Sequence, residues 1–258
     1  QAYRAPGAPI VAYAVESGMD DISNLVGIDP MDIRILNAAQ EGDRRADGVM
    51  NARIGAVETM NAVKDHPHYK APLGAAAPGK LRGRGVGMGF CRNNTGMACA
   101  VANVLPDGHV SLVEGSVDIG GSRTAIAQQF AEVIGIPVEE VHPQVGDTDT
   151  IGYTSVTGGS GVAFKSGWAA YTAAMDAKSQ MIKRASLIWD CPEDQVNFEN
   201  GHAFHKSDPE LKFTFKELAS QMPETGGAVV GRANLNPGGS GGSYSANIID
   251  VEVDIETG

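Results

Sequence analysis

The chain has 258 residues, of which 42% are hydrophobic and 20% are charged, as in an ordinary globular protein. The net charge of −11 excludes a nucleic-acid surface, which needs clustered Lys and Arg to neutralise phosphates. The odd set of cysteines (Cys91, Cys99 and Cys191) contains no C-x-x-C pair, and the sequence has no apolar run long enough to cross a membrane. These features argue against a disulfide framework, an iron–sulfur site in this chain or a membrane span. They favour a reducing compartment, the cytoplasm, with the periplasm as the alternative.

The first third of the sequence predicts helices. Residues 9–26 have helical spacing, and residues 29–39 begin with an Asp cap followed by Pro at the first helical position. A third amphipathic helix is expected over 54–65, followed by a Pro/Gly-rich connection at 66–80. The expected core positions of the first helix are Ile10, Tyr13, Ala14, Ile22 and Leu25.

Strands and helices mix after this connection, so we expect two domains, 1–80 and 81–258. The predicted strands cover 83–92, 97–104, 108–118, 140–146, short segments within 194–215, and 245–254. The predicted helices cover 122–134 and about 160–190. L-P-D-G at 105–108 predicts a hairpin turn, and the E-T-G with which the sequence ends resembles another. The predicted fold class is α+β.

Two Gly-Gly-Ser turns, at 120–122 and 158–160, each run into a predicted helix. Glycine lets backbone N–H groups approach a ligand, and a helix start offers unpaired N–H donors with partial positive charge. Two such turns predict a site for a large phosphate-bearing cofactor. The alternative is that both are simple strand-to-helix turns.

Four segments resemble one enzyme family in collinear order. They are A-Y-R-A-P-G at 2–7, G-F-C-R at 89–92, D-I-G-G-S-R-T-A-I-A-Q at 118–128 and G-D-T-D-T-x-G-Y-T-x-x-T-G-G-S at 146–160. On these segments the chain resembles the C-terminal part of the molybdopterin-binding subunit of the xanthine dehydrogenase, aldehyde oxidase and carbon monoxide dehydrogenase family. The resemblance covers nearly the whole chain, including the end of the first molybdenum-binding domain and much of the second.

This resemblance implies a cofactor, a reaction and partners. The cofactor is molybdopterin with molybdenum, commonly in the cytosine dinucleotide form. The implied reaction hydroxylates an aldehyde or N-heterocyclic carbon with water as the oxygen source. Electrons then pass to [2Fe–2S] clusters and FAD on partner domains or subunits, next to the remaining part of the molybdenum subunit.

The resemblance also implies roles for individual residues. Arg4 matches the arginine beside the cofactor, where its guanidinium suits oxygen acceptors. Ala5 replaces the cysteine that holds copper in carbon monoxide dehydrogenases, and it cannot bind a metal. Pro6 replaces an aromatic ring of purine-oxidising relatives. Phe90 and Cys91 belong to the implied substrate pocket, although Phe90 can equally be a core residue.

The implied cofactor contacts are Gly120, Gly121, Ser122, Thr124, Gln128, Thr157, Gly158, Gly159 and Ser160, together with Arg4 and Ala5. Gly121 departs from the glutamine of many relatives and offers only its N–H. Thr124 and Gln128 lie one turn apart, although Thr124 can instead cap its helix. We expect the carboxyl groups of Asp147 and Asp149 to accept from nearby backbone N–H groups rather than to bind a metal.

Part of the implied active site is missing from the sequence. The family's general base is a glutamate in a G-E-P-P-like motif, and no such motif occurs here. We do not assign that role to Glu114 or Glu252, because alternating strands leave such residues solvated. The chain starts at Gln1 without Met, and we expect a fragment or a split subunit. The remaining alternatives are a non-catalytic, degenerate scaffold and an unrelated nucleotide-binding domain.

Overall fold

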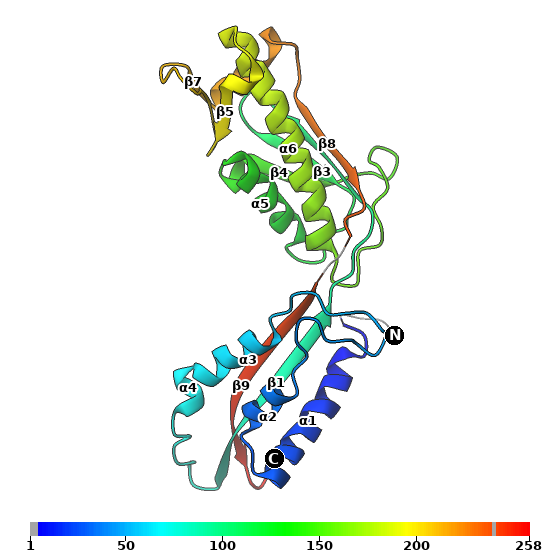
Figure 1. The fold of residues 1–258 in the computed structure, drawn as a ribbon, viewed down its shortest axis with the longest axis vertical. Coiled ribbons are helices and arrows are strands. Elements are labelled where there is room, and N and C mark those ends of the chain that lie inside the picture. The colour runs from blue at the N-terminus through cyan, green and yellow to red at the C-terminus, as the bar shows by residue number, and fades with distance from the viewer. Residues whose placement is uncertain (1–4, 239–240) are drawn as a thin grey trace. The chain divides into compact units, whose positions relative to one another are not determined.

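The computed structural model describes residues 5–238 and 241–258, which form two compact units (Figure 1). Unit 1 combines the chain up to Asn93 with Gly241–Gly258, and unit 2 is Asn94–Ser240. Arg4, our predicted catalytic arginine, lies outside the described residues. The predicted domain division at residue 80 concerns the family's domains and stays a prediction.

Unit 1 is a long two-stranded ribbon with helices on one face. β1 (Lys80–Arg92) pairs antiparallel with β9 (Gly242–Asp254) along their full length. The helices are α1 (Ala8–Val26), α2 (Pro30–Leu36), α3 (Ala56–Asp65) and α4 (Pro67–Lys70). A small core of Met31, Ala56, Met60 and Val86 joins them to the ribbon.

Two polar arrangements hold the helices of unit 1. The carboxylate of Asp29 caps α2 by accepting from the N–H groups of Met31 and Asp32, as predicted. The guanidinium of Arg34 is 3% exposed and bridges to α1 through the carboxylates of Glu16 and Asp20, at 2.6 and 2.8 Å. It also donates to the carbonyls of Pro30 and Glu16.

The predicted core face of α1 is wrong. Ile10, Tyr13, Ala14, Ile22 and Leu25 are all exposed, with 76% exposure at Ile10 and 85% at Leu25. Apolar residues occur around most of this helix, so their spacing does not identify the packed face. The Glu16–Arg34 ion pair identifies it instead, because it lies on the face that meets α2.

Unit 2 contains a four-stranded sheet in the order β4-β3-β2-β8. Its strands are β2 (Ala98–Val104), β3 (Val110–Glu114), β4 (Val141–Val145) and β8 (Val230–Leu235). Only the β3–β4 pair is parallel among the described strands, and the remaining pairs are antiparallel. The helices α5 (Ser122–Ile134) and α6 (Val162–Trp189) pack against this sheet and each other (Figure 1).

A second sheet in unit 2 has the order β5-β6-β7. It consists of β5 (Val196–Glu199), β6 (His202–His205) and β7 (Lys212–Thr214). The remaining elements are α7 (Phe215–Ser220) and the short 3-10 helices η1 (Val138–Glu140), η2 (Glu193–Gln195) and η3 (Met222–Glu224). The α+β class is therefore confirmed.

Small residues let α6 lie close to its sheet. Its buried face carries alanines with no exposed surface, Ala169, Ala170, Ala173, Ala174, Ala177 and Ala185. A Cβ atom at Gly231 on β8 would overlap the carbonyl oxygen of Ala173. The close crossing of helix and strand therefore requires glycine at this position.

Candidate functional site

The predicted pocket residues of unit 1 gather around the start of α1 and the ends of β1 and β9. Ala5, Phe90 and Cys91 line one cavity of about 280 Å³, and Pro6 is exposed without lining it. The ring of Phe90 is 53% exposed and tilts against that of Tyr244, with 5.1 Å between centroids. Two of the three predicted pocket residues, Phe90 and Cys91, therefore line one cavity, together with Ala5, which we predicted as a cofactor contact, and Tyr244.

Tyr244 was missed because the strand predicted from the sequence begins only at residue 245. In the structure β9 already begins at Gly242, and Tyr244 is the direct cross-strand partner of Phe90. A Cβ atom at Gly242 would overlap the Phe90 ring. This first residue of β9 thus makes room for the aromatic pair.

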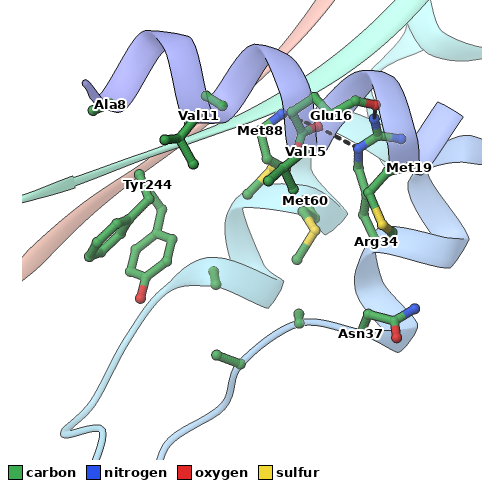
Figure 2. Close-up of a pocket in the computed structure, with 16 residues that line it drawn as sticks. Ala8, Val11, Val15, Glu16, Met19, Arg34, Asn37, Met60, Met88 and Tyr244 are labelled. Carbon is green, nitrogen blue, oxygen red and sulfur yellow. Dashed lines mark hydrogen bonds and ion pairs between the residues drawn. The ribbon is translucent and has the colours of Figure 1, made fainter. Parts of the chain in front are cut away.

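A second cavity of about 430 Å³ continues from the first and shares Ala8, Ala12, Gly89, Phe90 and Tyr244 with it. Figure 2 shows α1 along one side, Tyr244 at one end and the Glu16–Arg34 ion pair at the other. The other lining side chains are mainly Ala, Val and Met. Because its two charged groups neutralise each other, this cavity suits an uncharged, largely apolar group.

The first glycine turn, in unit 2, is held by a carboxylate of the chain itself. Gly120 and Gly121 have φ values of 109° and 86°, and neither would meet any atom with an added Cβ. The carboxylate of Asp118 accepts from the N–H groups of Gly120 and Ser122 at 2.9 and 3.0 Å and from the Ser122 hydroxyl. The Gly120 N–H, the Arg123 guanidinium and the Ser122 hydroxyl hold the pKa of Asp118 well below its usual range.

Other donors of this turn remain available. Gly121 is the N-cap of α5 and provides no side-chain cap. The N–H groups of Arg123 and Thr124 have no hydrogen-bond partner in the described part of the chain, as expected in a first helical turn. Thr124 and Gln128 are both exposed. The first turn therefore offers backbone donors that include the predicted residue Thr124, and Arg123 is an addition to the prediction.

The second glycine turn is closed by a neighbouring segment. Gly159 has φ 61° and Ser160 φ 58°, and α6 is capped by Gly161. Asn94 donates its N–H to the Gly159 carbonyl at 2.7 Å, and a Cβ atom at Gly159 would overlap the Asn94 side chain. Glycine is needed here for packing, whatever else the turn binds.

A buried polar network lies between the two turns. Glu114 is fully buried, against our expectation of a solvated strand residue, because α6 covers the end of β3. Its Oε2 accepts from the Ser116 N–H at 2.6 Å, while its Oε1 has no partner among the described residues. The Ser116 hydroxyl lies 2.7 Å from that of Ser166 on α6. Burial raises the pKa of Glu114, although the Ser116 N–H opposes that shift.

Lys165 was also missed by the sequence reasoning, although a lysine on the apolar face of the predicted helix was a signal that the sequence offered. Lys165 is 2% exposed, and its amine donates to the carbonyls of Ser155 and Val156. The Val117 N–H donates to the Thr157 hydroxyl at 3.2 Å. These contacts tie the segment before the second glycine turn to α6 and to the loop that follows β3.

Metal-binding clusters and membrane-spanning helices are both absent from the described residues. No group of three or more His, Cys, Asp or Glu side chains could hold a metal ion there. The Asp147 carboxylate accepts from the N–H of Asp149, the local role that we predicted. No helix within 5–238 or 241–258 is long and apolar enough to cross a bilayer.

The donors of unit 2 fit a molybdopterin nucleotide chemically. Such a cofactor carries phosphate and carbonyl oxygens, and the exposed N–H groups beside open glycines suit those acceptors. Among these backbone donors, the residues that we predicted as cofactor contacts are Gly121, Thr124 and Thr157. Individual cofactor contacts remain predictions.

Comparison with known proteins points the same way. The family described as "Molybdopterin cofactor-binding domain" matches residues 62–258. The putative xanthine dehydrogenase molybdenum-binding subunit XdhA of Escherichia coli K12 is 29% identical over 98% of this chain and 36% of its own length. The aldehyde oxidoreductase molybdenum-binding subunit PaoC of the same organism is 32% identical over 78% of this chain and 27% of its own.

Solved structures share the fold. The reconstituted carbon monoxide dehydrogenase from Oligotropha carboxidovorans superimposes with a TM-score of 0.79 at 22% identity, over 95% of this chain and 34% of that one. Aldehyde oxidoreductase from Desulfovibrio gigas gives a TM-score of 0.70 at 19% identity, over 100% of this chain and 28% of that one. The chain therefore spans about a third of the length of these proteins.

Proposed function

Because this chain belongs to the molybdopterin cofactor-binding domain family of xanthine dehydrogenase, aldehyde oxidase and carbon monoxide dehydrogenase large subunits, we propose that it forms part of a molybdenum hydroxylase. The proposed reaction hydroxylates an aldehyde or N-heterocyclic carbon with oxygen from water. The bound cofactor, in its cytosine dinucleotide form, supplies the two-electron redox chemistry. Partner domains or subunits with [2Fe–2S] clusters and FAD receive the electrons.

The observation that carries this proposal is the pair of exposed backbone-donor segments in unit 2. The N–H groups of Arg123 and Thr124 extend from the positive end of α5, and those of Val156 and Thr157 precede α6. Backbone donors can hold phosphate oxygens without a cluster of cations, which is consistent with the acidic composition of the chain.

Unit 1 supports an uncharged substrate. Phe90 and Tyr244 offer aromatic surface, and the cavities beside them carry no unpaired charge among their lining residues. Ala5 provides no ligand for copper, and Pro6 provides no stacking ring, so we do not propose carbon monoxide or a purine. An aromatic aldehyde or a neutral N-heterocycle fits best.

The proposal is tested on the purified complex that contains this chain. We expect molybdenum by elemental mass spectrometry, a fluorescent pterin after oxidation, and CMP after mild hydrolysis. When the reaction is run in ¹⁸O-labelled water, the oxygen that hydroxylation adds to an aryl carboxylate product should carry the label. A complex without molybdenum and pterin contradicts the proposal. A loaded complex without turnover supports the alternative of a non-catalytic scaffold, for which Gly121 and Pro6 are the motivating residues.

The substrate pocket has its own variant pair. Phe90→Ala removes aromatic surface from the cavity and should raise KM for an aryl aldehyde about fivefold or more, with a smaller change in kcat. Leu81→Ala is the control, because Leu81 lies on the same strand, is 63% exposed and does not line either cavity. Equal effects of the two substitutions would contradict a substrate-binding role for Phe90.

A further inference from the structure

The buried amine of Lys165 has an unusual set of partners. Its Nζ donates to the carbonyl and hydroxyl oxygens of Ser155, both at 2.8 Å, and to the carbonyl oxygen of Val156 at 2.7 Å. These acceptors match the three hydrogens of an ammonium group. All of them are neutral, so the ion is held by dipoles rather than by a salt bridge.

The geometry of the peptide bond turns this arrangement into a directional one. In a trans peptide the C=O of one residue and the N–H of the next point in opposite directions, and no described peptide bond is cis. Because the carbonyls of Ser155 and Val156 point toward Nζ, the N–H groups of Val156 and Thr157 point away from it. Val156 is 80% exposed and Thr157 is half-buried, so solvent reaches this part of the loop.

Both outward N–H groups are unused within the described part of the chain. Neighbouring contacts fix the segment on either side of them. The Ser155 N–H donates to the Met97 carbonyl at 2.8 Å, and the Thr157 hydroxyl accepts from Val117. Two adjacent donors on a loop anchored at both ends form a small cradle for an oxygen anion.

The charge of Lys165 adds to this effect. Burial lowers the pKa of the Lys165 amine, the charge of the Glu114 carboxyl group opposes that shift, and no described hydrogen bond joins the two side chains. Burial raises the pKa of Glu114 and so disfavours its anionic form. The positive charge behind the loop is therefore poorly neutralised, and it favours a negative group on the outer side.

We propose that Lys165 is a positioning residue for cofactor binding, which aims the N–H groups of Val156 and Thr157 at an anionic group of the molybdopterin nucleotide. This inference rests on the proposed function. The sequence already predicted Thr157 as a backbone donor, and the inference adds the N–H group of Val156 and the role of Lys165. It also gives Lys165 a role without contact to the cofactor.

The test uses Lys165→Met in the complete complex, with two matched controls. Lys183→Met removes the same charge from an exposed position on the same helix. Ser166→Ala removes the buried hydrogen bond to Ser116 and leaves the loop carbonyls and Lys165 in place. Lys165→Gln, which keeps donors without charge, replaces Lys165→Met if the latter does not accumulate as folded protein.

We expect molybdenum and pterin per complex to fall at least about fivefold in the Lys165 variant and less than about twofold in both controls. The amide of Ser155, measured by hydrogen exchange in the cofactor-free complex, should exchange at least about tenfold faster in the Lys165 variant and not in the two controls. The melting temperatures of the cofactor-free complexes show whether the loss of bound cofactor in a variant simply follows its loss of thermal stability.

Two results would overturn the inference. One is unchanged cofactor content in the Lys165 variant of a wild-type complex that does carry molybdenum. The other is equal cofactor loss in Ser166→Ala at an equal loss of melting temperature, since loading would then follow stability. A wild-type complex without molybdenum is a different outcome, because it contradicts the proposed function itself.

Discussion

Replacement of Arg34 by Met is the sharpest test of how unit 1 is held together. The Arg34 side chain is 3% exposed, whereas its partners Glu16 and Asp20 are 21% and 43% exposed. Removing one member of a buried ion pair costs about 3–5 kcal/mol, because the other charge stays buried without a partner. Water reaches both carboxylates here, so we expect a lower cost of about 2–4 kcal/mol.

Hydrogen exchange of α1 and α2 amides measures this effect within unit 1. Since 1.4 kcal/mol corresponds to a factor of ten, protection should fall by about 30- to 700-fold. Arg45→Met is the control, because Arg45 pairs with Asp47 at the surface and should leave α2 unchanged. If Arg34→Met keeps full protection of α2, the cost of burying the charges cancels their attraction, and our reasoning about this pair is wrong.

Three further predictions concern burial and close packing. The raised pKa of Glu114 keeps its proton on the folded chain above pH 4.5, where the unfolded chain loses it, so stability falls as pH rises through that window. In Glu114→Gln the urea concentration at the unfolding midpoint should no longer fall with pH in this window. The free energy of unfolding at neutral pH should rise by about 1.4 kcal/mol for each pH unit by which the pKa of Glu114 is raised. Burial and the hydrogen bond to Asp29 raise the pKa of Tyr69 from 10.0 to about 12. The stabilisation from this hydroxyl should therefore be lost as the pH rises between those values. The ultraviolet titration curve of Tyr69→Phe should lack the corresponding tyrosine ionisation step. Gly231→Ala should cost about 1–3 kcal/mol in thermal melts because of the overlap with α6, whereas Gly85→Ala on β1 meets no atom and serves as control.

Local signals explain why much of the fold could be predicted. The helix over 122–134 was predicted with both ends correct, because glycines with left-handed backbone flank it at 121 and 135. The hairpin at 105–108 forms as expected, with Gly108 donating to Leu105. Asp29 and Pro30 mark the start of α2 for the same reason. In each case a residue with a strong conformational preference sits at the boundary of the element.

Features that depend on distant contacts could not be predicted. The strand β8 and the helix α7 were missed, because β8 is defined by its pairing with β2 and α7 has only six residues. Glu114 lies on the same alternating face of β3 as the buried residues Val110 and Leu112, but its carboxyl group led us to expect a solvated position. The pairing of Phe90 with Tyr244 joins positions far apart in the sequence. Such pairings leave no local periodicity.

The two glycine turns look equivalent in the sequence, since each is a Gly-Gly-Ser segment before a helix, but their surroundings differ in the structure. At the first, Gly120 and Gly121 face open space, and Asp118 uses some of the donors that a ligand would need. At the second, Gly159 packs against Asn94, so its lack of a side chain is explained without any ligand. An anion-binding role for the second segment therefore rests on the residues before the glycines, where the charge of Lys165 and the direction of two peptide groups agree. Gly159 is thus needed for packing, while the donors that we propose for anion binding lie before it.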